Sequence, residues 1–259
     1  MDFGIKDKVA IVTGANRKGA LGDVIAKALA AEGAVIACVD IVAKGAEAVA
    51  DDINNAGGKA KAYGADQSRH EQVVEAVGKI KTELGPPSIL INNAALLRGG
   101  GRIQKIPLED WHRLIEVDLD GPYYWVREVW DSMQEQGWGR IINIASIAAI
   151  MGGFGQANYA AAKAGVIAMA KTAALEGARA GITANAVTLG IVNTLGEDPD
   201  NAPLQTGEVF DRIKAKIAMR EFAMPQDVAG MVTFLASQQA RYITGQSIHV
   251  MGGLDLFTY

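Results

Sequence analysis

Short apolar runs alternate along the chain with segments whose apolar residues recur at helical spacing. The run KVAIVT at 8–13 predicts a buried strand, because strands covered on both faces read as continuous β-branched runs. DVIAKALAAEGA at 23–34 has the periodicity of an amphipathic helix, and AVIACVD at 34–40 predicts a second buried strand. This strand–helix–strand order is typical of a parallel sheet.

The same alternation continues to the end of the chain and predicts one doubly wound α/β domain over residues 1–259. We expect a Rossmann-like fold, a seven-stranded parallel sheet with helices on both faces. Further helices are expected at 43–56, 109–136 (with a break near Gly121-Pro122), 158–180, 208–218 and 225–236, and further strands at 59–65, 88–91, 139–145, 182–188 and 243–250.

The segment 193–224 interrupts this rhythm. It contains Pro199 and Pro203 among acidic and amide residues, followed by a short helical pattern. An insertion after the sixth strand, on the side where such sheets bind ligands, predicts a substrate lid.

Composition narrows the class of protein. The 259 residues are 49% hydrophobic and carry a formal net charge of -4 without a Lys/Arg block, so we expect no nucleic-acid partner. No apolar run reaches the ~18 residues of a membrane helix, and the N-terminus lacks a signal-peptide layout, so no membrane partner is expected. The single cysteine, Cys38, fits a cytoplasmic location.

A glycine-rich loop, GANRKGALG, follows the first strand at 14–22. Gly14 permits a tight exit from the strand, and Gly22 allows the following helix to approach the sheet and a pyrophosphate. Asp40 ends the second strand, where a carboxylate can accept the ribose hydroxyls of NAD and repel the 2′-phosphate of NADP. We therefore expect NAD as the cofactor, although Arg17 and Lys18 leave NADP open.

A serine, a tyrosine and a lysine form the candidate catalytic set. Tyr159 and Lys163 lie one helical turn apart, and an ammonium beside a phenol favours the phenolate form. Tyr159 is therefore a candidate general acid/base, and Ser146, at a strand's carboxyl end, can orient a substrate oxygen. Taken alone, YxxxK also fits an ordinary surface pair. The three histidines are scattered, and no metal site is expected.

Together these motifs resemble the short-chain dehydrogenase/reductase family over nearly the whole chain. The matching pieces are TGANRKGALG at 13–22, VD at 39–40, AD at 65–66, NNAA at 92–95, Ser146, YAAAK at 159–163, LGIVNT at 189–194 and YITGQSIHVMGG at 242–253.

The resemblance implies hydride transfer between a nicotinamide and a carbinol carbon, with Tyr159 moving the hydroxyl proton. Lys163 would bind the nicotinamide ribose, and Asp118, in VDLDG, stands at a fourth catalytic position that is usually asparagine. Substrate contacts are expected from Ser146, Phe154, Gln156 and Tyr159. Cofactor contacts are expected from Gly14, Asn16, Arg17, Leu21, Asp40, Ile41, Asp66, Gln67, Asn93, Ala94, Tyr159, Lys163, Val192 and Thr194.

Two departures from the family pattern matter. The glycine loop is longer than the usual TGxxxGxG, with Ala20 where the middle glycine would stand. Asp118 brings a new charge near Lys163, although a backbone role survives the change. Asp66 has two compatible interpretations: a cap for the next helix, or a hydrogen bond to the adenine amino group.

Three functions follow from these observations. The main prediction is an NAD-dependent dehydrogenase or reductase for a secondary alcohol or ketone with a hydrophobic or cyclic body. The alternative is a 3-oxoacyl-carrier-protein reductase, which GQANYAAAKAG at 155–165 resembles closely. Those enzymes look NADPH-dependent and dock the carrier through two arginines, where this chain has Gly137 and Ala180. A non-redox NAD-binding protein is the third.

The remaining expectations concern the pocket and the assembly. Apolar pocket residues are expected at Leu97, Ile147, Ala148 and Ile191, and Arg98 and Arg102 could meet an anionic group. The helix around Trp125 and Trp130 resembles the family's subunit interface, which predicts a homotetramer.

Overall fold

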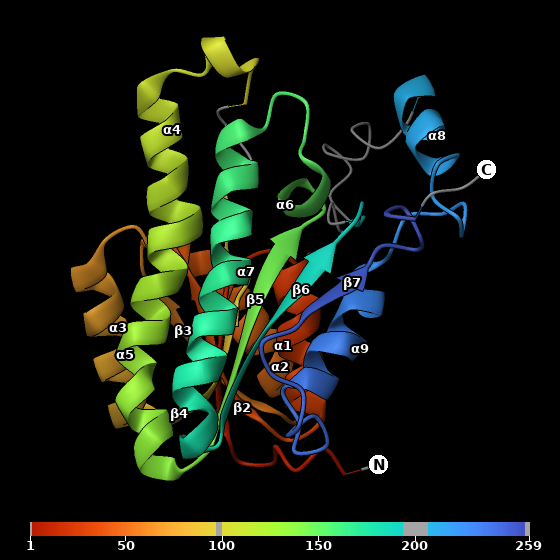
Figure 1. The fold of residues 1–259 in the computed structure, drawn as a ribbon. Helices are drawn as coiled ribbons and strands as arrows, with labels where there is room; N and C mark the ends of the chain where they lie inside the picture. The colour runs from red at the N-terminus through yellow and green to blue at the C-terminus, as the bar shows by residue number, and fades with distance from the viewer. Residues whose placement is uncertain (1, 97–99, 194–206, 257–259) are drawn as a thin grey trace.

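The computed structural model describes residues 2–96, 100–193 and 207–256. Its sheet has seven parallel strands in the order β3-β2-β1-β4-β5-β6-β7, with helices on both faces (Figure 1), which confirms the predicted fold class. The order reverses between β1 and β4, so a crevice is expected at their carboxyl ends. The strands are β1 Val9–Thr13, β2 Val35–Asp40, β3 Lys59–Gly64, β4 Pro87–Asn92, β5 Gly139–Ser146, β6 Ile182–Leu189 and β7 Ser247–Val250.

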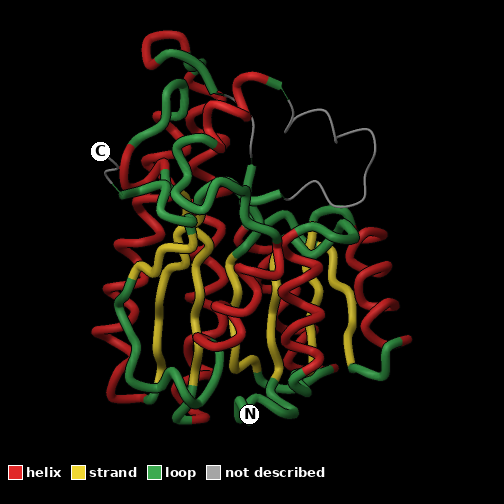
Figure 2. Tube along the Cα trace, turned by 90° about the vertical axis from the view of Figure 1, so that its right-hand side faces the viewer, coloured by secondary structure: helices red, strands yellow, loops and turns green. Residues whose placement is uncertain are grey.

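Two large clusters of buried apolar side chains pack the helices against the two faces of the sheet. One face carries α1 Leu21–Ala31, α2 Ala43–Asn55 and α9 Pro225–Leu235, and the other carries α3 His70–Glu83, α5 Gly121–Gln136 and α7 Ala157–Gly177. The loops that follow the carboxyl ends of the strands gather at one edge (Figure 2). The shorter helices are α4 Leu108–Ile115, α6 Ala148–Met151 and α8 Glu208–Lys214, with 3-10 turns at Ile103–Lys105 and Ala178–Ala180.

The long helical region does not break at Gly121-Pro122, contrary to the prediction. A π-helical turn, Glu116–Asp120, joins α4 to α5, and Pro122 falls in the first turn of α5. Pro122 has no N–H to donate to the preceding turn, and the Val117 carbonyl in that π turn accepts a hydrogen bond from Gln67 Nε2 at 2.8 Å instead. The π turn also carries Asp118, whose carboxylate lies near Lys163 of α7.

Three further differences concern single residues. Asp66 does not cap α3, because that helix begins at His70 and the carboxylate instead accepts hydrogen bonds from Ser68. Trp125, on the helix that was expected to resemble a subunit interface, is fully buried in the core and adds nothing to the surface of α5. Strand β7 begins at Ser247, later than the predicted residue 243.

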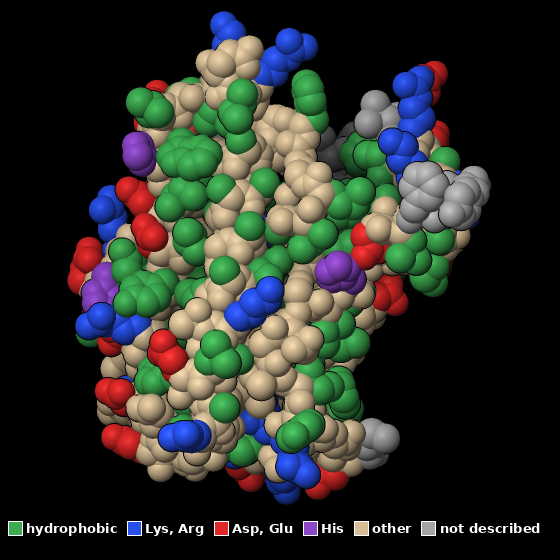
Figure 3. All heavy atoms as spheres, in the orientation of Figure 1, with side chains coloured by type: hydrophobic (Ala, Val, Ile, Leu, Met, Phe, Trp, Pro, Cys, Tyr) green, Lys and Arg blue, Asp and Glu red, His purple; other side chains and the backbone are tan. Residues whose placement is uncertain are grey.

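Within the described residues, no helix is long and apolar enough to span a membrane. Acidic and basic side chains are interspersed on the face shown in Figure 3.

Candidate active site

A cleft of about 850 Å³ opens at the carboxyl ends of the strands. Its walls come from the residues that follow β1 to β6, together with the start of α1 and of α7. Most of the predicted site residues line it: Gly14, Asn16, Arg17, Leu21, Asp40, Ile41, Asp66, Gln67, Asn93, Ala94, Ser146, Gln156, Tyr159, Lys163 and Val192.

The start of α1 forms one end of the cleft. Its N-cap residue, Ala20, provides no side-chain cap, so the helix presents backbone N–H groups and the positive end of its dipole. Gly14 has a φ of 72°, and a Cβ on Gly22 would lie 2.2 Å from the Gly14 carbonyl oxygen. Only glycine at position 22 permits this packing. The arrangement fits the pyrophosphate of a dinucleotide.

Asp23, which sequence reasoning missed, braces the long glycine loop. Its buried carboxylate accepts the Gly19 N–H at 2.8 Å and pairs with Lys27 Nζ at 2.7 Å. Lys27 also reaches Asp52 of α2 at 2.8 Å. An acid in the first turn, four residues before a lysine, was the available signal. The extra loop residues are thus tied to two helices.

Asp40 is held from two sides. Its Oδ1 accepts hydrogen bonds from Asn16 Nδ2 at 2.9 Å and from the Val42 N–H at 2.8 Å. Burial raises the pKa of this carboxyl, and the two hydrogen bonds oppose that rise. The glycine loop and the end of β2 are therefore linked through Asp40.

The part of the cleft around Asp66 is built by residues that follow β3 and β4 and by α4. Arg113 of α4 donates to Asp66 Oδ2 at 3.1 Å. Burial by itself would raise the pKa of the Asp66 carboxyl. The hydrogen bonds from Ser68 and Arg113 outweigh burial, and the pKa is lowered. Gln67 Nε2 donates to the Ala94 carbonyl at 3.2 Å and to that of Val117 at 2.8 Å. Arg113 was also missed, because nothing local links residue 113 to residue 66.

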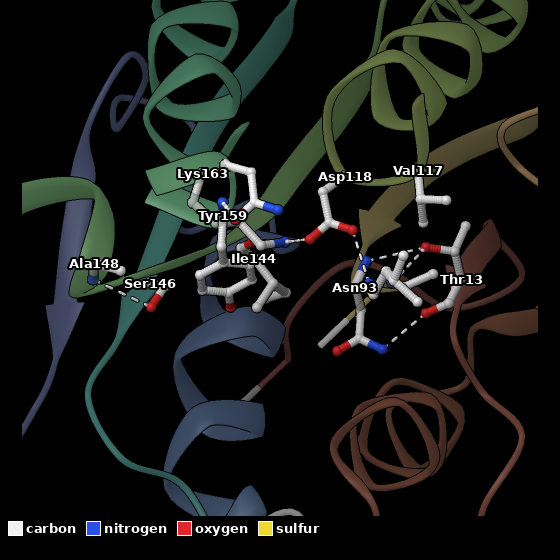
Figure 4. A network of polar contacts seen from close by, with 12 residues as sticks. Thr13, Asn93, Val117, Asp118, Ile144, Ser146, Ala148, Tyr159 and Lys163 are labelled. Carbon is white, nitrogen blue, oxygen red and sulfur yellow. Dashed lines mark hydrogen bonds and ion pairs between the residues drawn. The ribbon is translucent and has the colours of Figure 1, made fainter. Parts of the chain in front are cut away.

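Thr13 connects the ends of β1 and β4. Its Oγ1 accepts the N–H groups of Asn93 and Ala94, both at 3.0 Å, and donates to the Ile91 carbonyl at 3.3 Å. Asn93 Nδ2 returns a bond to the Thr13 carbonyl at 2.8 Å (Figure 4). We call these contacts the Thr13 latch. It fixes the floor of the cleft between its two halves.

Ser146, Tyr159 and Lys163 come together in the other half of the cleft (Figure 4). Lys163 Nζ lies 5.6 Å from the centre of the Tyr159 ring and donates to the Ile144 carbonyl at 3.2 Å. The Ser146 hydroxyl accepts the Ala148 N–H at 3.2 Å, which leaves its proton available to a ligand. This set can bind a substrate oxygen and exchange a proton with it.

Asp118 lies behind this set and is fully buried. Its Oδ2 is 3.4 Å from Lys163 Nζ, and its Oδ1 accepts the Leu96 N–H at 2.7 Å. Burial raises the pKa of the carboxyl, while Lys163 and the Leu96 N–H oppose the rise.

The structure does not place Phe154 in the cleft. Its side chain is 89% exposed, and Arg102 lies over its ring at 5.9 Å. Ile147 and Ile191 line the cleft, whereas Ala148 is buried behind it. Leu97, Arg98 and residues 194–206, which include Thr194, lie outside the described residues. The rest of the segment that was predicted as a lid contains α8.

Comparison with known proteins agrees with this geometry. The family described as "Enoyl-(Acyl carrier protein) reductase" matches residues 14–255. A 3-oxoacyl-[acyl-carrier-protein] reductase of Staphylococcus epidermidis is 38% identical over 96% of this chain and 99% of its own length. The Escherichia coli protein of the same name is 37% identical over 95% of this chain and 97% of its own length.

Two solved structures share the fold throughout. A candidate gluconate dehydrogenase from Agrobacterium tumefaciens has a TM-score of 0.92 and 28% identity, with each chain covered to 100%. A candidate NAD(P)-dependent gluconate 5-dehydrogenase from Beutenbergia cavernae, with NADP bound at low occupancy, has a TM-score of 0.90 and 31% identity over 99% of this chain and 100% of its own.

These relatives correct the predicted cofactor preference. The expectation that Asp40 selects NAD over NADP is wrong, because a solved relative holds NADP and the matched relatives are the carrier-protein reductases. The physical reason lies in the contacts of Asp40. Its carboxylate is engaged by Asn16 and Val42, and Arg17 of the same loop lines the cleft, so one acidic residue does not fix the local potential.

Proposed function

The chain belongs to the short-chain dehydrogenase/reductase family, and on that premise we propose that it reduces the ketone of a 3-oxoacyl thioester borne by an acyl carrier protein. The observation that carries the proposal is the near full-length match to reductases of that name, combined with an intact Ser146, Tyr159 and Lys163 at the cleft.

The residues present suit this chemistry. A bound dinucleotide supplies the hydride, and the cleft is large enough for it, since ligand sites commonly measure about 300–1,000 Å³. The Ser146 hydroxyl would hold the ketone oxygen, and Tyr159 would donate its proton to that oxygen as the carbon is reduced. The Lys163 side chain is held by the Ile144 carbonyl and Asp118, and its Nζ lies 5.6 Å from the centre of the Tyr159 ring.

For the cofactor we propose NADP(H). The bound NADP of the Beutenbergia relative supports this, and Arg17 offers a cation at the cleft wall. Lys18, which is exposed and lies 3.8 Å from Asp52, adds a second cation to the same loop. A loop that carries these two cations attracts a 2′-phosphate that the Asp40 carboxylate alone would repel.

The carrier-docking arginines are missing from the expected positions. Gly137 ends α5 and Ala180 lies in the 3-10 turn before β6, so both sit at the amino ends of the strands, opposite the cleft. The test must therefore separate chemistry from docking. We expect NADPH oxidation with 3-oxoacyl groups on the carrier protein and on coenzyme A alike. The proposal fails if neither thioester is reduced by an enzyme that turns over another substrate.

A second candidate is oxidation of a polyhydroxy acid such as gluconate. The observation that favours it is the full-length structural match to two candidate gluconate dehydrogenases. Parallel assays with gluconate and with the 3-oxoacyl thioesters, in the presence of NADP(H) and NAD(H), decide between the two by the ratio of kcat/KM values.

We also propose a homotetramer. Apolar side chains gather over α5 and α7 in Figure 3, and Tyr123 and Leu175 of these helices are 47% and 83% exposed. An exposed apolar surface across two helices is typical of an interface between subunits. Light scattering should give four times the chain mass, and a monomer would contradict the assembly.

A further inference from the structure

A buried pair of opposite charges stands behind the catalytic tyrosine. Asp118 has no exposed surface and Lys163 is 2% exposed, yet their side chains approach to 3.4 Å between Oδ2 and Nζ. The family pattern usually places asparagine at position 118. An asparagine could keep the contact with the Leu96 N–H through its carbonyl oxygen, but it would carry no charge. The negative charge of the carboxylate is therefore what distinguishes this site from that pattern.

The surroundings of Asp118 are buried and hold few other charges, so its negative charge acts strongly on Lys163. Among the described residues, the charged side chain that faces it is Lys163 from α7, and the Leu96 N–H after β4 satisfies its other oxygen. Oδ2 makes no hydrogen bond of good geometry, so Lys163 is its electrostatic partner. Lys163 in turn donates to Ile144 of β5. Little water reaches this pair, and the interaction is weakly screened.

We propose that Asp118 is a positioning residue that acts through Lys163: as its counterion, it holds the ammonium in place and weakens its attraction for the Tyr159 oxygen. An asparagine site leaves one positive charge beside the tyrosine, whereas this pair is neutral overall. A positive charge promotes loss of the phenol proton, and a negative charge opposes it. This chain therefore carries out proton transfer at higher pH than the same site with asparagine.

The direction of the expected pH shift follows from the reaction written as oxidation of the alcohol. The alcohol gives a hydride, with its two electrons, to the dinucleotide and its hydroxyl proton to Tyr159. Tyr159 must first be a phenolate to take that proton. Removing the negative charge of Asp118 favours the phenolate, so the rate of oxidation should rise at lower pH.

Asp118→Asn is the matched test, because it removes the charge and keeps an acceptor for Leu96. We expect the midpoint of the pH profile of kcat/KM to move toward acid by about one pH unit, the size of one buried charge at a distance of several ångströms. An unmoved midpoint would overturn the inference. Asp118→Ala serves as the second variant: it should move the midpoint in the same direction and also raise KM, because the Leu96 N–H loses its acceptor.

A readout without turnover separates this inference from the proposed oxidoreductase chemistry, on which it rests. The ultraviolet difference spectrum between the enzyme and Tyr159→Phe, titrated without cofactor, reports phenolate formation at Tyr159. That titration should shift toward acid in the Asp118→Asn background, and coincident curves would refute the role of Asp118. Failure of every substrate to react would count against the proposed function alone.

Discussion

Thr13→Val removes one hydroxyl from the floor of the cleft at nearly constant volume. The Thr13 side chain is 1% exposed, and its Oγ1 is the centre of the latch between β1 and β4. Valine restores the shape and cannot accept a hydrogen bond. The substitution therefore tests whether the latch stabilises the fold and the cofactor site together.

The hydrogen bonds that Thr13 Oγ1 accepts determine how much stability Thr13→Val should lose. The Asn93 N–H keeps a second acceptor, the Ile91 carbonyl at 3.1 Å, whereas the Ala94 N–H has no other acceptor among the described residues. Leaving one buried donor unsatisfied costs about 1–3 kcal/mol. Ala94 is half-buried at the cleft, where water can partly replace the bond. We therefore expect the free energy of unfolding to fall by about 2 kcal/mol.

Urea denaturation followed by circular dichroism measures this change, and the melting temperature should fall by roughly 4–8 °C. Thr13→Ser is the control. It keeps the hydroxyl, loses one methyl group worth about 0.8 kcal/mol, and should bind NADP as the unmodified protein does. The reasoning is refuted if Thr13→Val is within about 0.5 kcal/mol of the unmodified protein, or if the serine variant loses as much.

Tyr159→Phe should lower turnover by at least about 100-fold while cofactor affinity, measured by fluorescence titration, is retained; near-normal turnover would exclude Tyr159 as the proton donor. Gly22→Ala should abolish dinucleotide binding, because the new Cβ would meet the Gly14 carbonyl oxygen at 2.2 Å, and an unchanged Kd would show that α1 can shift. Arg17→Ala should weaken NADP binding more than NAD binding; an unchanged ratio of Kd values would show that Arg17 does not contact the 2′-phosphate.

The fold was predictable because its signals are local. The apolar runs of β1 and β2, with a glycine loop between them, indicate a parallel unit from sequence alone, and the strands lie within a residue or two of their predicted bounds. Strand β7 is the exception. Asn185 Nδ2 donates a hydrogen bond to the Ile243 carbonyl at 2.8 Å. The first residue of the predicted strand is therefore bonded to a side chain, and backbone pairing as β7 begins only at Ser247.

The site was predictable only where its residues follow a motif. Ser146, Tyr159 and Lys163 lie together as their spacing indicated. Arg113 and Asp23 belong to no motif themselves, although their partners Asp66 and Gly19 do. Phe154 illustrates the opposite error, because a loop's sequence does not determine the direction of its side chains, and this one lies 89% exposed.

The segment that follows β4 joins both halves of the site, which neither the motifs nor the cleft outline alone reveals. Asn93 and Ala94 are held by Thr13 beneath the expected dinucleotide, and two residues later the Leu96 N–H is held by Asp118, the partner of Lys163. Because so short a segment cannot move at one end without moving at the other, displacement of the latch should disturb the catalytic lysine. We therefore expect a substitution at Thr13 to change both the stability of the segment after β4 and the rate of proton transfer at Tyr159.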